Sequence, residues 1–80
     1  MNIDMKQVTI MLSTIADVKR FVGAAAQYPF DICLHSGKYA VDGKSLLGVF
    51  SLELTKPIEC EIQSDDCGKF LDEIAFCTVK

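Results

Sequence analysis

The sequence predicts an α+β fold in which a four-stranded antiparallel sheet carries three helices on one face. First, stretches of alternating apolar and polar residues are interspersed with stretches whose apolar residues recur at helical spacing. Second, their order, β-α-β-β-α-β-α, packs naturally as one antiparallel sheet with its helices on one side. Third, 80 residues, 50% of them apolar, suffice for one domain, residues 1–80, with a modest core.

The first strand and the first helix come from the N-terminal third of the chain. Residues 5–12 alternate and then run apolar, which predicts a strand. Thr14, followed three residues later by Asp17, forms a looser capping box at a helix start. We expect this helix to extend to residue 27, because Pro29 is incompatible with its continuation.

A hairpin is predicted next. Apolar and polar residues alternate over residues 30–35, as expected for a strand with one buried face. The turn signal at residues 36–38 then leads into a second strand, residues 39–42.

The stretch 44–54 is too apolar for the helix of about two turns that it predicts. Ser45 is suited to cap this helix by accepting a hydrogen bond from a free backbone N–H group. We expect Val49 and Leu52 to face the core. A surface helix buries only one stripe, so some apolar side chains should stay exposed as a docking patch: Leu46, Leu47 and Phe50. Gly48 lowers helix propensity, which suggests that another backbone approaches closely there.

The last third of the chain predicts a strand and a helix. Residues 58–63 alternate, with Cys60 pointing inward. The polar residues 64–66 offer cap oxygens to a final helix. Its apolar positions keep helical spacing and are Phe70, Leu71, Ile74 and Ala75.

Composition excludes several classes of function. A net charge of −3 and a pI near 4.9 argue against a nucleic-acid-binding module. The sequence shows neither a secretory signal nor an apolar run long enough to span a membrane, so we expect a cytoplasmic protein. The cysteines form no C-x-x-C pair and only one histidine is present, so we expect reduced thiols, no metal site and no cofactor. These cysteines are Cys33, Cys60, Cys67 and Cys77.

The run K-S-L-L-G-V-F-S-L, residues 44–52, and the order of elements resemble the HPr family, the histidine-containing phosphocarriers of the bacterial sugar phosphotransferase system. The resemblance implies an open-faced β-sandwich in which this run opens the second helix. In low-GC Gram-positive members the serine of the run, here Ser45, is the target of a regulatory kinase.

The resemblance also shows a departure at the phosphocarrier position. Family carriers hold a histidine in a Gly-x-His-x-Arg-Pro setting at the first helix N-terminus, where the helix dipole and free N–H groups stabilise the phosphoryl group. Counting back from Phe21-Val22, the histidine position falls on Thr14, the arginine on Ala16 and the proline on Asp17. We therefore expect no phosphocarrier chemistry and no enzyme activity, as in the catabolite-repression paralogues, which lack the histidine and keep the serine.

These expectations combine into a regulatory protein-interaction module with Ser45 as its phosphorylation site. We expect partners to bind at Lys44, Leu46, Leu47, Gly48 and Phe50. The resemblance implies HPr kinase/phosphorylase and phosphotransferase or catabolite-control proteins as partners, without nucleic acid or membrane, and a monomer or weak dimer.

Other readings stay open at this point. Ser45 can be a purely structural helix cap, and the domain can be a passive subunit without partners. A phosphocarrier or enzyme-like protein can use a non-standard residue instead, with Thr14, His35 and Cys67 as the candidates.

Overall fold

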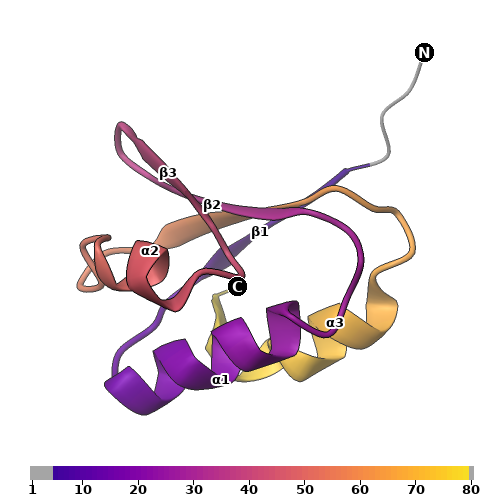
Figure 1. The fold of residues 1–80 in the computed structure, drawn as a ribbon, viewed down its shortest axis with the longest axis horizontal. Helices are drawn as coiled ribbons and strands as arrows, with labels where there is room; N and C mark the ends of the chain where they lie inside the picture. Colours follow the sequence, from indigo (N-terminus) through magenta and orange to yellow (C-terminus); the bar gives the residue numbers. More distant parts are fainter. Residues whose placement is uncertain (1–4, 80) are drawn as a thin grey trace.

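One antiparallel sheet with helices on a single face makes up the structure, a computed structural model that describes residues 5–79 (Figure 1). The α+β class and the one-sided placement of the helices are as predicted from the sequence. The elements, in chain order, are β1 (Lys6–Ile10), α1 (Ile15–Ala25), β2 (Ile32–Ser36), β3 (Tyr39–Asp42), α2 (Leu46–Phe50), β4 (Ile58–Ile62), α3 (Gly68–Glu73), a 3₁₀ turn (Ala75–Cys77) and β5 (Thr78–Val79).

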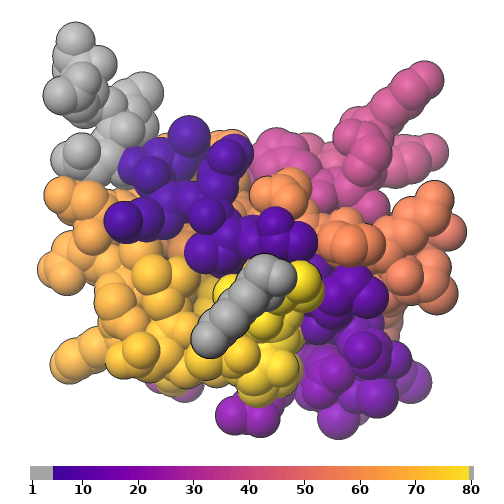
Figure 2. Space-filling view, turned by 180° about the vertical axis from the view of Figure 1, so that it is seen from behind, coloured from indigo at the N-terminus to yellow at the C-terminus, as the bar shows by residue number. Residues whose placement is uncertain are grey.

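The sheet has five strands in the order β3-β2-β4-β1-β5, so the predicted count of four is wrong. The additional strand is the two-residue β5, which pairs antiparallel with the end of β1. The backbone N–H of Met11 also donates a 2.8 Å hydrogen bond to the carbonyl of Cys77. Figure 2 shows these C-terminal residues, in yellow, against the indigo β1. Two residues are too few for the alternation that identifies strands in a sequence.

The two central strands bury one face only. Ile32 and Leu34 of β2 are buried, and so are Ile58, Cys60 and Ile62 of β4. Leu34 stands opposite Cys60 in the register, so the inward residues of both strands form one apolar surface under the helices. The residues between them face the other side of the sheet.

Helix α1 begins as predicted and ends early. The Thr14 side chain accepts a 3.1 Å hydrogen bond from the N–H of Asp17. The Asp17 carboxylate accepts from the N–H of Ser13 at 3.2 Å, one residue before the position that a regular capping box would use. The helix stops at Ala25 rather than at residue 27, because the last hydrogen bonds before Pro29 tighten to three-residue spacing.

Helix α3 lacks the predicted side-chain cap. Its N-cap is Cys67, which makes no side-chain cap hydrogen bond. The hydroxyl of Ser64 instead accepts a 3.0 Å hydrogen bond from the N–H of Asp66, so this serine closes a local turn ahead of the helix. The expectation that residues 64–66 cap this helix is therefore wrong.

Phe70 is the centre of the contact between α3 and α1. Its ring is fully buried and lies 5.9 Å from Phe21, 5.4 Å from Tyr28 and 6.0 Å from Phe30, each in edge-on geometry. The hydroxyl of Tyr28 also donates to the carboxylate of Glu73, which ties the end of α1 to α3 and raises the pKa of Tyr28.

The four cysteines are free thiols, three of them in the core. Burial raises the pKa of Cys60 to about 12 and that of Cys77 to about 11. Both thiols are therefore protonated near neutral pH and fill apolar space.

We predict that Phe70→Ala lowers the free energy of unfolding by about 3–5 kcal/mol, since it opens a cavity among three aromatic rings. A domain of this size has about 5–15 kcal/mol in total, so the loss is a large fraction of its stability. Urea denaturation followed by circular dichroism measures the loss. Leu47→Ala, at an apolar residue that is 82% exposed, is the control and should leave the urea midpoint almost unchanged. Equal effects of the two substitutions would contradict the assignment of Phe70 to the core.

We also predict that stability falls at alkaline pH because of the core thiols. The pKa of Cys60 is higher in the folded state than its ordinary value of 9.0, so the folded state keeps a proton that the unfolded state releases. This contribution is complete below pH 9.0 and is lost as the pH rises toward about 12. Between these two pH values, the free energy of unfolding falls by about 1.4 kcal/mol per pH unit for a fully buried group. Urea denaturation under reducing conditions should show a shallower alkaline loss for Cys60→Val than for wild type. Parallel curves for the two proteins would refute this assignment.

Candidate functional site

The start of α2 holds the candidate phosphorylation residue, Ser45. Its backbone is extended (φ −101°, ψ 111°), and its hydroxyl accepts a 3.1 Å hydrogen bond from the N–H of Gly48. At the other end, the hydroxyl of Ser51 donates a 2.6 Å hydrogen bond to the carbonyl of Gly48. Two serine side chains thus hold a helix of five residues, shorter than the two turns expected.

Gly48 is explained by its own chain. A Cβ atom there would lie 3.2 Å from the Ser45 Oγ atom and 3.4 Å from the Cβ of Val41 in β3. The glycine therefore lets α2 pack closely against its cap and against the sheet. Within the described chain, the atoms nearest to this position are side-chain atoms, and approach by the backbone of a partner stays a prediction.

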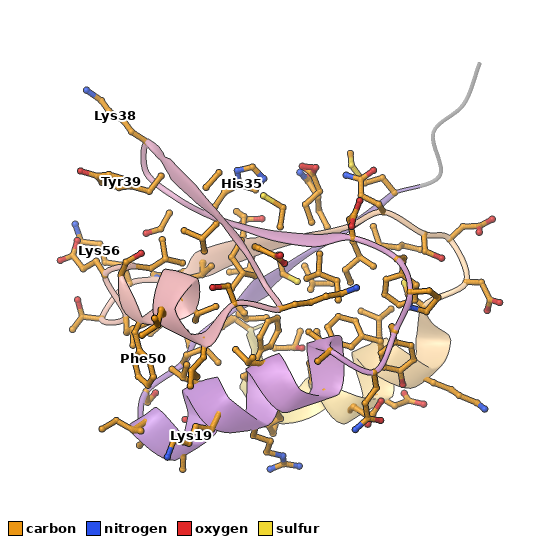
Figure 3. All side chains as sticks on the ribbon, in the orientation of Figure 1. Lys19, His35, Lys38, Tyr39, Phe50 and Lys56 are labelled. Atoms are coloured by element: carbon orange, nitrogen blue, oxygen red, sulfur yellow. The ribbon has the colours of Figure 1, made fainter. Side chains whose placement is uncertain are left out.

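The apolar residues of α2 divide between core and surface. Val49 is fully buried and Leu52 nearly so, as predicted. Leu47 is 82% exposed and Leu46 38% exposed. Phe50 is half-buried against the core, and Figure 3 shows its ring pointing from α2 toward α1. We call Leu46, Leu47 and the exposed part of Phe50 the α2 patch.

Helix α1 packs against α2, and its first residue is a further exposed apolar residue that the sequence analysis did not consider (Figure 1). Ile15, the first residue of α1, is 64% exposed. It directly follows the N-cap Thr14, and Val18, three residues later, is fully buried.

Lys44 precedes Ser45 and directs its side chain toward the end of α1. Its ammonium group donates a 2.7 Å hydrogen bond to the backbone carbonyl of Tyr28, just beyond the end of α1. Its backbone N–H donates to the carboxylate of Asp42 at 2.9 Å. The lysine is half-buried and joins the β3–α2 connection to α1, so its charge is already engaged within the chain.

The sequence resemblance to HPr proteins puts the expected phosphocarrier position at the start of α1. Thr14 is exposed, but its side-chain oxygen is used as the helix cap. Ala16 is exposed and has no polar side-chain atom. The Asp17 carboxylate binds the N–H of Ser13, so a negative charge already lies at this helix N-terminus.

The three residues of the enzyme-like alternative lie on different elements. Thr14 caps α1, and His35 projects from β2 away from the helices (Figure 3). Nε2 of His35 lies 3.4 Å from the Glu61 carboxylate without hydrogen-bond geometry. Cys67 is buried at the start of α3, and burial raises the pKa of its thiol, which opposes the reactive thiolate.

Residues 5–79 offer neither a metal cluster nor a membrane-spanning helix. In this part of the chain, no three histidine, cysteine, aspartate or glutamate side chains come together in a way that could hold a metal ion. The helices described there are too short and too polar for any of them to cross a membrane.

Comparison with known proteins gives a likeness in structure. No model of a protein family and no curated protein matches the sequence. The structure is similar to that of HPr-C-His from Thermoanaerobacter tengcongensis, with a TM-score of 0.69, 20% sequence identity and coverage of 89% of this chain and 88% of the other. It is also similar to a phosphocarrier protein HPr from Bacillus anthracis strain Ames, with a TM-score of 0.66, 23% identity and coverage of 90% and 94%. This chain therefore has the fold of HPr phosphocarrier proteins.

Proposed function

We propose that this chain is an HPr-like regulatory protein that binds other proteins through α2. In this proposal it acts in the cytoplasm, in the sugar phosphotransferase system or carbon catabolite control of a bacterium. It neither relays phosphate nor catalyses a reaction. Its partners are HPr kinase/phosphorylase and phosphotransferase or catabolite-control proteins.

The observation that carries the proposal is the composition of α2. A helix of five residues places a capping serine directly before Leu46 and Leu47, and Leu47 is the most exposed large apolar residue described. The core does not need these two leucines, since Val49 and Leu52 already anchor the segment. Exposed apolar residues that adjoin one another are typical of interaction sites.

Phosphorylation of Ser45 fits the local geometry in one respect and not in another. The phosphate would lie at the N-terminus of α2, whose first turn carries no acidic residue and presents backbone N–H groups. Lys44 would not neutralise it unless the lysine left Tyr28. In this proposal the added charge changes the surface beside Leu46 and so controls which partner binds.

The residues at the start of α1 support the proposed absence of phosphate relay. A phosphocarrier needs a nucleophile whose phosphoryl adduct transfers rapidly, and a threonine hydroxyl is a poor one. The side-chain oxygens of Thr14 and Asp17 also already accept hydrogen bonds, from the backbone N–H groups of Asp17 and Ser13 respectively. An incoming phosphoryl group would compete with these bonds and with the aspartate charge.

We predict that enzyme I and phosphoenolpyruvate place no phosphate on this protein at the rate at which they label a histidine-bearing HPr in the same assay. Transfer of labelled phosphate, followed by gel and intact mass, measures the rate. If wild type were labelled rapidly and His35→Ala or Thr14→Ala were not, the chain would be a carrier with a non-standard residue.

We predict that an HPr kinase and ATP add one phosphate to wild type and none to Ser45→Ala. Ser51→Ala is the matched control, because it also removes a serine side-chain bond to Gly48 but leaves the proposed target in place. Each substitution should cost about 1 kcal/mol of stability, so circular dichroism should show both variants folded. Equal phosphorylation of wild type and Ser45→Ala, or none of wild type, would reject Ser45 as the target.

A further inference from the structure

Strand β3 is an open edge of the sheet. Among residues 5–79 its only strand neighbour is β2, and the β2–β3 hairpin projects beyond the helices in Figure 1 and at the upper right of Figure 2. Tyr39 is 73% exposed, and Ala40 and Asp42 are exposed as well. On the helix side of the sheet, α2 packs against Val41 of β3 and the loop after α2 lies beside Tyr39, but no described strand pairs with the outer edge of β3.

The backbone groups that face this edge follow from the hairpin turn. Ser36 and Tyr39 flank the two-residue turn and pair first, so they exchange hydrogen bonds across the hairpin. Bonding alternates along an antiparallel pair, so Ala40 directs its N–H and C=O away from β2, toward the open edge. The N–H of Asp42 points the same way, while its carbonyl accepts from Ser45 at 3.0 Å.

The side chains along the edge also alternate. Ala40 stands opposite His35 and Asp42 opposite Cys33, so both lie on the sheet face away from the helices. Burial and the carboxylates of Glu61 and Asp42 raise the pKa of Cys33, which agrees with this placement.

The residues at the hairpin tip follow the same pattern. Figure 3 shows Lys38 pointing away from the helices, as His35 does. Tyr39 and Val41 lie on the opposite face, where Val41 stands opposite the buried Leu34.

We propose that two copies of this chain associate through β3, strand against strand and antiparallel, about a twofold axis at Ala40. The two Ala40 residues then exchange both of their free backbone hydrogen bonds. Tyr39 meets Val41 of the second copy, an aromatic and β-branched cross-strand pair. Lys38 meets Asp42 of the second copy. By symmetry each of these side-chain pairs occurs twice.

The charges on β3 favour a second copy of this chain as the partner at this edge. An edge strand with a lysine normally resists pairing with other chains. Here the antiparallel register places that lysine opposite an aspartate of the same sequence, while the small Ala40 side chain allows close approach on the axis. The segment Lys38–Asp42 is therefore complementary to itself in charge and in shape. The contact area of two short strands is small, so the dimer should be weak and should dissociate with added salt.

Sedimentation velocity over micromolar to millimolar concentrations tests the pairing. Wild type should show a monomer–dimer equilibrium at low salt. Lys38→Glu and Asp42→Lys should each raise the dimer Kd about tenfold or more, because both symmetric pairs become repulsive. Lys69→Glu, on α3, makes the same change in net charge as Lys38→Glu outside the interface and should dimerise like wild type.

Mixing Lys38→Glu with Asp42→Lys is the decisive experiment. In a mixed dimer, the glutamate introduced by Lys38→Glu faces the lysine introduced by Asp42→Lys, and the remaining Lys38 and Asp42 face each other. The mixture should therefore recover dimers that neither variant forms alone. The double variant Lys38→Glu/Asp42→Lys should also dimerise. Asp42→Lys loses the bond to the Lys44 N–H, but the double variant shares this loss and so controls for it.

Backbone pairing has a separate test. Ala40→Pro removes an N–H that the hairpin does not use, so the variant should stay folded by circular dichroism and be monomeric. In wild type, the amide signals of Ala40 and Asp42 should shift with concentration in two-dimensional NMR. A wild type that stays monomeric at millimolar concentration and low salt would overturn the proposal, and so would charge variants that fail to recover dimers on mixing.

Discussion

Burial of only one face of the sheet is the constraint on which the rest of the structure depends. The helices lie on one side and pack on a single apolar surface that the inward residues of β2 and β4 form. With 80 residues there is no second layer to cover the other face of the sheet, and no strand to pair with the outer edge of β3, among the residues described. Surfaces available to other proteins are therefore the outward side of the helices, the open sheet face and the edge.

The size of α2 explains why its leucines are exposed. An isolated helix of five residues is not stable in water, so this one depends on serine caps and on tertiary contacts. Val49 supplies the main buried contact, and Gly48 allows close packing against Val41. One turn and a half presents a single inward stripe, and Leu46 and Leu47 lie outside it. Leu47, at 82% exposure, therefore buries little apolar surface in the fold, and Leu46, at 38%, buries more of its side chain.

Sequence patterns predicted the elements that local periodicity determines and failed where a distant contact decides. The alternation of β4 and the capping of α1 and α2 needed only neighbouring residues. The hydrogen bond from Lys44 to the carbonyl of Tyr28 joins residues sixteen positions apart, and no pattern of neighbouring residues predicts it. β5 forms because β1 offers a free edge to a segment of two residues. Within the candidate site, the exposure of Leu47 could be predicted, but the half-buried position of Phe50 depends on how α2 packs on α1.

The two helix N-termini differ in how much anion-binding capacity they retain. At α1, Thr14 accepts one N–H and the carboxylate of Asp17 binds another, so a full negative charge already opposes the positive end of the dipole. At α2, the cap is the neutral hydroxyl of Ser45, and the first turn contains no acidic residue. A dianionic phosphate is opposed less in the second environment than in the first, because no carboxylate lies in the first turn of α2. The electrostatic environment at the start of α2 is therefore more favourable to an added phosphate than that at the start of α1.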